Sequence, residues 1–252
     1  MTFEFEFMGA MATVIVPEHP NGKWIWKTEF LYAFDKAERD LLDEGYTRVY
    51  YGVSNMYGAP VAIRKMHAFY FYVKERFSLA DKCVLFGFSR GGLYAFHFAL
   101  AHPDLVCGVY LDAPVLDVRT WPRENSREQG ELFRVFSLNK ETLATFGENP
   151  VELLREYFAL GLPTLLVAGG ADEVVPYEPN SKRMIEEAEK ANFPLQYHIK
   201  PDCKHHPHSL EDDTRPILDF VKSLSYHAER SEAYTLCSHK ASAFGAFAPK
   251  KS

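Results

Sequence analysis

Segments typical of strands alternate with segments typical of helices along most of the sequence. Apolar or β-branched runs predict strands, near residues 46–53, 83–86, 106–111, 163–168 and 195–199. Amphipathic stretches predict helices, near residues 34–43, 60–77, 91–101, 181–191 and 214–224. Two further strand-like segments, 3–7 and 12–16, predict an antiparallel pair, and Pro17, Pro20 and Asn21-Gly22 predict a loop over about residues 17–30. The alternation therefore predicts an α/β fold, with a mostly parallel, doubly wound sheet flanked by helices.

One stretch, residues 115–162, breaks this alternation. It contains short helical patterns without a strand-like run, so we expect a small helical lid inserted after one strand. A chain of 252 residues otherwise suits one α/β domain, expected over residues 1–226. Residues 227–252 lose the periodic pattern, which predicts a peripheral or poorly ordered tail.

The composition narrows the classes of partner. A formal net charge of −6 disfavours nucleic acid and anionic membranes, because both attract basic surfaces. The four cysteines form no C-x-x-C pair, and no apolar run approaches the roughly 18 residues of a spanning helix. The N-terminus lacks the basic and apolar regions of a signal peptide. We therefore expect a cytoplasmic protein without a disulfide framework.

The residues with the clearest chemical meaning are Gly87-Phe88-Ser89-Arg90-Gly91. An apolar strand precedes this G-x-S-x-G pattern and an amphipathic helix follows it, which is the setting of a nucleophile elbow. The sharp turn pushes the Ser89 hydroxyl out of the sheet. The Arg90 N–H then lies at a helix N-terminus, where it can donate to a developing oxyanion. Ser89 is therefore the candidate nucleophile.

A serine nucleophile needs a base and an acid that orients the base, and both follow the serine in chains with this elbow. Asp172 ends the small-residue turn after the strand at 163–168, where it can reach across to a histidine. Asp112, at the end of the preceding strand, is the alternative acid. Glu173 is adjacent to Asp172, but its longer side chain would have to fold back.

The candidate base lies on the loop after the last strand. His205 has the favoured spacing from the closing helix, and His206 and His208 remain alternatives. Together with Cys203 these histidines also resemble a metal cluster, but no carboxylate spacing supports one. We expect neither a metal nor a cofactor.

With these motifs, the chain resembles the α/β-hydrolase family over about residues 10–225. Four segments more narrowly resemble a bacterial subgroup classed as esterases: Trp24–Lys27, Ser89–Gly92, Asp112–Pro114 and His205–His208. The resemblance implies a serine carboxylic-ester hydrolase that acts through an acyl-enzyme. One departure is that the family's His-Gly pair at the oxyanion loop is absent. We therefore expect the second oxyanion donor to be a backbone N–H near Trp24 to Trp26, with Trp24 as the candidate.

Tryptophans and basic residues suggest a substrate. Trp26 and Trp121 fall in segments expected to border the site, where flat rings could bind a sugar or an aromatic acid. Four basic side chains could bind a carboxylate, namely Lys27, Arg90, Arg119 and Arg123. The leading hypothesis is hydrolysis of an acylated or methyl-esterified carbohydrate or an aromatic ester. The alternatives are an acyltransferase, a peptidase with the same triad, or a non-catalytic ligand-binding homologue.

Overall fold

The computed structural model describes residues 1–226, so the predicted tail at 227–252 lies outside the described residues. The strands are β1 (Thr2–Phe7), β2 (Ala10–Ile15), β3 (Trp24–Lys27), β4 (Thr47–Tyr51), β5 (Cys83–Phe88), β6 (Val106–Asp112), β7 (Thr164–Gly169) and β8 (Gln196–Lys200). The α-helices are α1 (Lys36–Asp43), α2 (Pro60–Arg76), α3 (Gly91–Ala101), α4 (Arg127–Phe136), α5 (Lys140–Leu143), α6 (Leu154–Ala159), α7 (Arg183–Lys190) and α8 (Arg215–Lys222).

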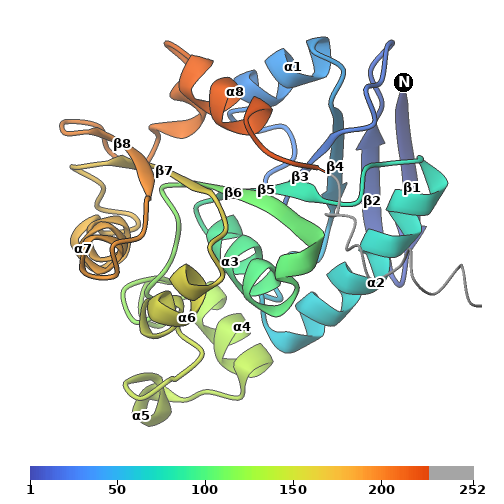
Figure 1. Cartoon of the computed structure of the whole chain (residues 1–252). Helices are drawn as coiled ribbons and strands as arrows, with labels where there is room; N and C mark the ends of the chain where they lie inside the picture. The colour runs from blue at the N-terminus through green and yellow to red at the C-terminus, as the bar shows by residue number, and fades with distance from the viewer. Residues whose placement is uncertain (227–252) are drawn as a thin grey trace, which may run out of the picture.

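The strands form one sheet in the order β1-β2-β4-β3-β5-β6-β7-β8. β1 pairs antiparallel with β2, and β2 pairs antiparallel with β4. Every pairing from β4 through β3 to β8 is parallel. The predicted fold class, a mostly parallel sheet of the α/β-hydrolase kind flanked by helices, is confirmed. Figure 1 shows α1 and α8 on one face of the sheet and α2, α3 and α6 on the other.

The central strands are the apolar core of the molecule. All residues of β5 and β6 are buried, as expected for strands covered by helices on both faces. Helix α3 follows β5 directly and is buried along nearly its whole length. The turn between β5 and α3 is therefore held from both sides by packed elements, which fixes the position of Ser89.

Strand β3 lies within residues 17–30, which the sequence pattern predicts to be a loop. Only four residues long, it is too short to show a period, and Pro17 and Pro20 before it are typical of loops. It pairs with β4 on one side and β5 on the other. The loop after β3 consequently meets the turn that carries Ser89.

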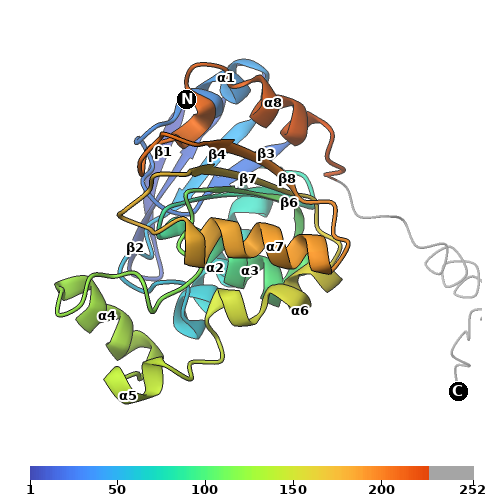
Figure 2. The same ribbon diagram turned by 90° about the vertical axis from the view of Figure 1, so that its left-hand side faces the viewer.

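The segment between β6 and β7 contains α4, α5 and α6. Figure 2 shows α4 and α5 projecting away from the body of the molecule. Helix α6 instead packs against α3 and α7 and buries Leu154, Tyr157 and Phe158. The projecting part of the predicted lid thus consists of α4 and α5, whereas α6 belongs to the helical layer.

Candidate active site

Ser89 lies directly after β5 with a backbone φ of 50°. This left-handed conformation is uncommon for a residue with a β-carbon, and it is the strained turn that a nucleophile elbow requires. The Ser89 N–H donates to the Asp112 carbonyl at 2.9 Å, and the Val115 N–H donates to the Ser89 carbonyl at 2.9 Å. A β-carbon at Gly87 would lie 2.8 Å from the Ala95 β-carbon, so only glycine fits there.

The structure brings Ser89, His205 and Asp172 together in one chain of contacts. Ser89 Oγ lies 3.0 Å from His205 Nε2, and His205 Nδ1 lies 2.7 Å from Asp172 Oδ2. A carboxylate next to Nδ1 favours the tautomer with the proton on Nδ1, which leaves Nε2 able to accept the serine proton. The Val174 and Val175 N–H groups donate to Asp172 Oδ1 at 2.9 and 3.0 Å. The acid is therefore held rigidly while it orients the imidazole.

The loop that carries His205 lies tightly against the end of β7. The Ala171 N–H donates to the Cys203 carbonyl at 3.0 Å, and the Gly170 N–H donates to the Lys200 carbonyl at 2.9 Å. A β-carbon at Gly170 would lie 2.6 Å from the Pro201 carbonyl oxygen. The small residues before Asp172 thus allow the acid and base loops to pack directly on each other.

The alternative acid and bases have different places. His208 Nδ1 lies 2.7 Å from Asp112 Oδ1, and the Tyr110 hydroxyl donates to the other oxygen of Asp112. His208 and Asp112 are buried, and the His208 ring stacks on Phe88 with 5.3 Å between centroids. This second pair fixes the far end of the loop that carries His205.

His206 is exposed, and its ring stacks on Phe34 at 4.9 Å between centroids. Loss of solvation and the neighbouring His208 lower the pKa of the His206 imidazole. Glu173 is also exposed, beside the buried Asp172. Within residues 1–226, no group of three or more His, Cys, Asp or Glu side chains is arranged to hold a metal ion. The geometry therefore favours His205 over its two neighbours as the base.

Arg90 directly precedes α3, so its backbone N–H lies at the helix N-terminus next to Ser89. The prediction that Trp24 supplies the second donor is wrong. Trp24 begins β3 and is fully buried, and the parallel register that pairs Ile25 with Val84 places its backbone at the amino end of β5, away from the end that carries Ser89. The loop after β3 lies at the site instead, since a β-carbon at Gly91 would lie 3.1 Å from Glu29 Cβ.

An ion pair ties this loop to the elbow. Arg90 Nη2 and Nε lie 3.0 and 3.2 Å from Glu29 Oε2, and Glu29 is only 2% exposed. Burial raises the pKa of the Glu29 carboxyl, and the adjacent Arg90 charge opposes that rise. Thr28 Oγ1 also donates to the Gly91 carbonyl at 2.8 Å. Together these contacts hold the Glu29 and Phe30 backbone next to the start of α3.

Lys27 does not contribute to a carboxylate site. Its ammonium is fully buried, 2.7 Å from Glu38 Oε1 and 3.9 Å from the centroid of the Phe88 ring. Burial lowers the pKa of Lys27 and raises that of Glu38. Of the other basic residues predicted to bind a carboxylate, Arg119 is paired with Asp117 at 2.7 Å, and Arg123 is exposed.

The tryptophans form no common wall. Trp26 is fully buried in β3 and packs against Phe98 and Phe69, with centroids 5.2 and 5.6 Å apart. Its predicted role in substrate binding is therefore wrong, because no solvent-facing surface of the ring is left. Trp121 is half-buried before α4, 6.1 Å from the Tyr57 ring. The Tyr57 ring in turn lies 6.0 Å from the Arg90 guanidinium. Trp121, in the inserted segment, is therefore connected to Arg90 only through Tyr57.

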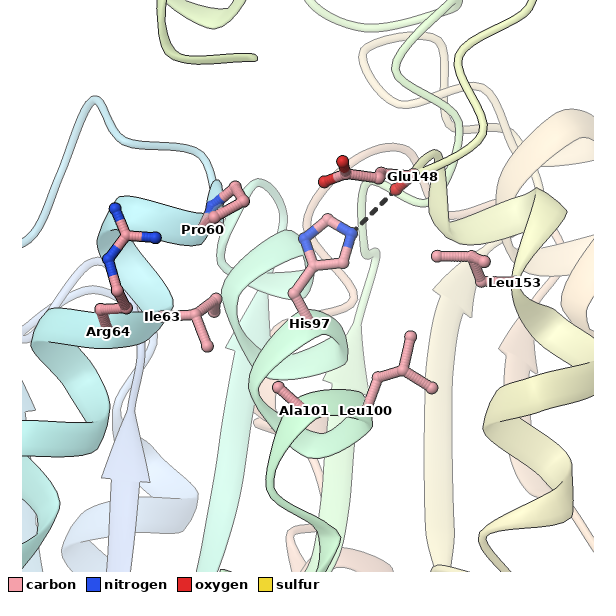
Figure 3. Close-up of a pocket in the computed structure, with 9 residues that line it drawn as sticks. Pro60, Ile63, Arg64, His97, Leu100, Ala101, Glu148 and Leu153 are labelled. Carbon is pink, nitrogen blue, oxygen red and sulfur yellow. Dashed lines mark hydrogen bonds between the residues drawn. The ribbon is translucent and has the colours of Figure 1, made fainter.

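A groove of about 350 Å³ lies between α2, α3 and the segment before α6. Figure 3 shows His97 between Pro60 and Ile63 on one side and Leu153 on the other, with Nε2 directed at the Glu148 carbonyl. None of its lining residues is Ser89, Asp172 or His205. This groove is therefore separate from the triad.

Comparisons with known proteins agree with this fold. The model of the prolyl oligopeptidase family matches residues 64–227, well over half of the chain. A comparison with curated proteins gives no match. Within residues 1–226, no helix is both long and apolar enough to cross a membrane.

Three solved structures illustrate the similarity. The fluorophosphonate-binding serine hydrolase F of Staphylococcus aureus has a TM-score of 0.70 at 17% identity, with 88% of this chain and 97% of that chain covered. Porphyromonas gingivalis dipeptidyl peptidase 4 has a TM-score of 0.64 at 15% identity, with 88% and 35% covered. Pyrococcus horikoshii acylaminoacyl peptidase has a TM-score of 0.66 at 14% identity, with 92% and 42% covered.

At such low identities these similarities show the fold and not the substrate. The chain spans 35% of the length of the dipeptidyl peptidase and 42% of that of the acylaminoacyl peptidase. The narrower resemblance to a bacterial esterase subgroup stays a prediction. The family match and the shared fold establish the broader assignment: the chain belongs to the prolyl oligopeptidase family of α/β-hydrolase serine hydrolases.

Proposed function

We propose that this protein is a serine carboxylic-ester hydrolase that acts through an acyl-enzyme on Ser89. The observation that carries the proposal is the continuous set of contacts from Ser89 Oγ through His205 to Asp172, at 3.0 and 2.7 Å. These are hydrogen-bond distances suited to proton transfer from the nucleophile to its base. The left-handed backbone of Ser89 supports the same role.

In the proposed reaction, Ser89 Oγ attacks the ester carbonyl while its proton moves to His205 Nε2. The Arg90 N–H and a backbone N–H of the Glu29–Phe30 segment donate to the oxyanion. His205 then protonates the leaving alkoxide, and the acyl group stays on Ser89. Water gives a proton to His205 and its hydroxyl to the acyl carbon, after which the carboxylic acid leaves and the proton returns to Ser89. Every group comes from the chain and water, so this mechanism requires no metal or cofactor.

A peptidase is the second candidate, because the family model and two of the three similar structures carry peptidase names. The two peptidases are more than twice as long as the part that this chain matches, whereas the S. aureus protein, named only as a serine hydrolase, is matched over 97% of its length. One feature of the site disfavours an aminopeptidase. Glu29, the acidic side chain nearest Arg90, is buried and paired, so it does not offer a carboxylate to a substrate amino terminus.

The test is hydrolysis of p-nitrophenyl acetate, with alanine and N-acetylalanine p-nitroanilides as amide substrates. We expect ester turnover by the wild type, which Ser89→Ala and His205→Ala lower by several orders of magnitude. His206→Ala is the matched control and should lose far less activity than His205→Ala, since its ring packs on Phe34 and takes no proton from Ser89.

Turnover of the amides alone would favour the peptidase, and product formation only with an added alcohol would favour an acyltransferase. Absence of any turnover would indicate a non-catalytic homologue. A loss of activity in His206→Ala with normal activity in His205→Ala would contradict the assigned base.

A further inference from the structure

The loop between β3 and α1 exposes three aromatic side chains. Phe30, Tyr32 and Phe34 are 37%, 61% and 38% exposed, which is unusual for large apolar or aromatic residues grouped within five positions. The backbone at Phe30 and Phe34 is left-handed, with φ of 58° and 51°. Residues with a β-carbon rarely adopt this conformation unless surrounding structure holds them there, and such residues gather at functional sites.

These rings border the triad from two directions. The Phe30 ring centroid lies 5.2 Å from Arg90 Cζ, and Arg90 directly follows Ser89. The Phe34 ring lies 4.9 Å from His206 and 4.7 Å from His208, on the loop that carries His205. Phe30 is thus next to the nucleophile turn and Phe34 is next to the base loop. The two rings thus flank residues adjacent to the nucleophile and to the base.

The chemistry of the pair selects what it can bind. Phenylalanine rings present flat apolar faces without a hydrogen-bonding group, and aromatic partners gain from stacked or edge-to-face contact with them. The Arg90 charge beside Phe30 is balanced by Glu29, 3.0 Å away. A sugar ring can lay its C–H face on such a ring, but its hydroxyl groups need polar partners around the rim that the two phenylalanines do not supply, whereas a planar apolar ring needs none.

We propose that Phe30 and Phe34 form an aromatic subsite that binds the planar ring of an aromatic ester. The proposal rests on the proposed ester hydrolysis at Ser89 and names its substrate class. It also replaces Trp26, whose ring is buried in the core, with residues that the sequence pattern did not indicate.

The test compares esters that differ only in the planarity of the ring. Ethyl phenylacetate is compared with ethyl cyclohexylacetate for the acyl side, and benzyl acetate with cyclohexylmethyl acetate for the alcohol side. The intervening methylene keeps the intrinsic reactivity of each pair similar. We expect a higher kcat/KM for the aromatic member of at least one pair. Phe30→Leu and Phe34→Leu should each lower that advantage roughly three- to tenfold, the usual strength of an aromatic pair.

Tyr32→Leu is the matched control, because this exposed ring lies over Arg48, 5.8 Å from its Cζ, and not beside the triad. Circular dichroism and titration with a fluorophosphonate normalise every variant to its folded, active fraction. Binding of each ester to Ser89→Ala, measured by calorimetry, repeats the comparison without turnover. Preferential binding of the aromatic esters by a protein that hydrolyses none would support the subsite while contradicting the proposed function.

Three results would overturn the subsite. One is equal kcat/KM and equal binding for planar and saturated rings. Another is an aromatic preference that Phe30→Leu and Phe34→Leu leave unchanged relative to Tyr32→Leu. A strong preference for an acetylated methyl glucoside over all four ring esters would also overturn it, in favour of a carbohydrate.

Discussion

His208 and Asp112 form a buried acid–imidazole pair directly beside the triad, and at the scale of single residues they support its geometry. His208 holds the loop that carries His205, and Asp112 accepts through its backbone carbonyl from the Ser89 N–H at 2.9 Å. The pair therefore connects the base loop to the nucleophile turn. A small movement of either would lengthen the Ser89–His205 contact, to which proton transfer is sensitive.

We predict that His208→Leu lowers kcat at least tenfold with little change in KM, because the base is displaced and not the substrate. It should also lower the free energy of unfolding by about 1–3 kcal/mol, since it removes the imidazole donor from Oδ1 of the buried Asp112 carboxylate and leaves the Tyr110 hydroxyl on Oδ2. His208→Asn keeps a donor near the position of Nδ1 and should recover most of both losses. Steady-state kinetics and urea unfolding measure this, with His206→Ala as control. Equal kcat in His208→Leu and wild type would contradict the prediction.

Individual site residues differ in how far the sequence predicts them. Ser89, Asp172 and His205 follow from a local turn pattern and a chain order, and the structure places the three side chains in contact. The roles predicted for Trp24 and Trp26 were wrong because a tryptophan is compatible both with a loop that borders a site and with a buried strand. The Glu29–Arg90 ion pair joins positions far apart in the sequence. No local periodicity indicates such a contact.

At the scale of elements, the longer helices and central strands were predictable. Helices α2 and α3 and strands β5 and β6 have enough residues to show periodicity or a continuous apolar run. Strand β3 was not predictable, because four residues after a proline-containing loop are too few to show the alternation or the apolar run of a strand. Because β3 was not predicted, the expected oxyanion donor was placed on the strand itself, whereas the residues that lie against the turn carrying Ser89 belong to the loop after it.

The insertion shows a second limit at this scale. Its short helices were predicted as one lid, but α6 is fixed to α3 and α7 by buried Tyr157 and Phe158. Amphipathic spacing shows that a helix has an apolar face but not which surface that face covers. Tertiary packing assigns α6 to the helical layer and leaves α4 and α5 projecting.

At the scale of the whole molecule, buried His97 predicts a dependence of stability on pH. Burial lowers the pKa of this imidazole below its ordinary value of 6.5. Below pH 6.5 the unfolded chain therefore binds a proton that the folded protein does not, so stability falls as the pH decreases toward the lowered pKa. We expect the melting temperature to decrease as the pH is lowered from 7 to 5.

His97→Gln is the matched variant, because its amide can still donate to the Glu148 carbonyl, which accepts from His97 Nε2 at 2.9 Å (Figure 3). It should reduce the pH dependence of the melting temperature without abolishing it, since the pKa values of His102 and His206 are also lowered. Thermal unfolding at pH 5, 6 and 7 measures the change. An identical slope in wild type and variant would show that His97 does not govern acid sensitivity.

The central claim, that Ser89 is an activated nucleophile, is tested most directly by labelling the whole protein with a fluorophosphonate. Peptide mass spectrometry then locates the adduct. We predict one adduct per molecule on Ser89, none in Ser89→Ala, and labelling slowed by orders of magnitude in His205→Ala, because the imidazole removes the serine proton. No labelling of folded wild-type protein, or an adduct on another residue that persists in Ser89→Ala, would contradict the claim.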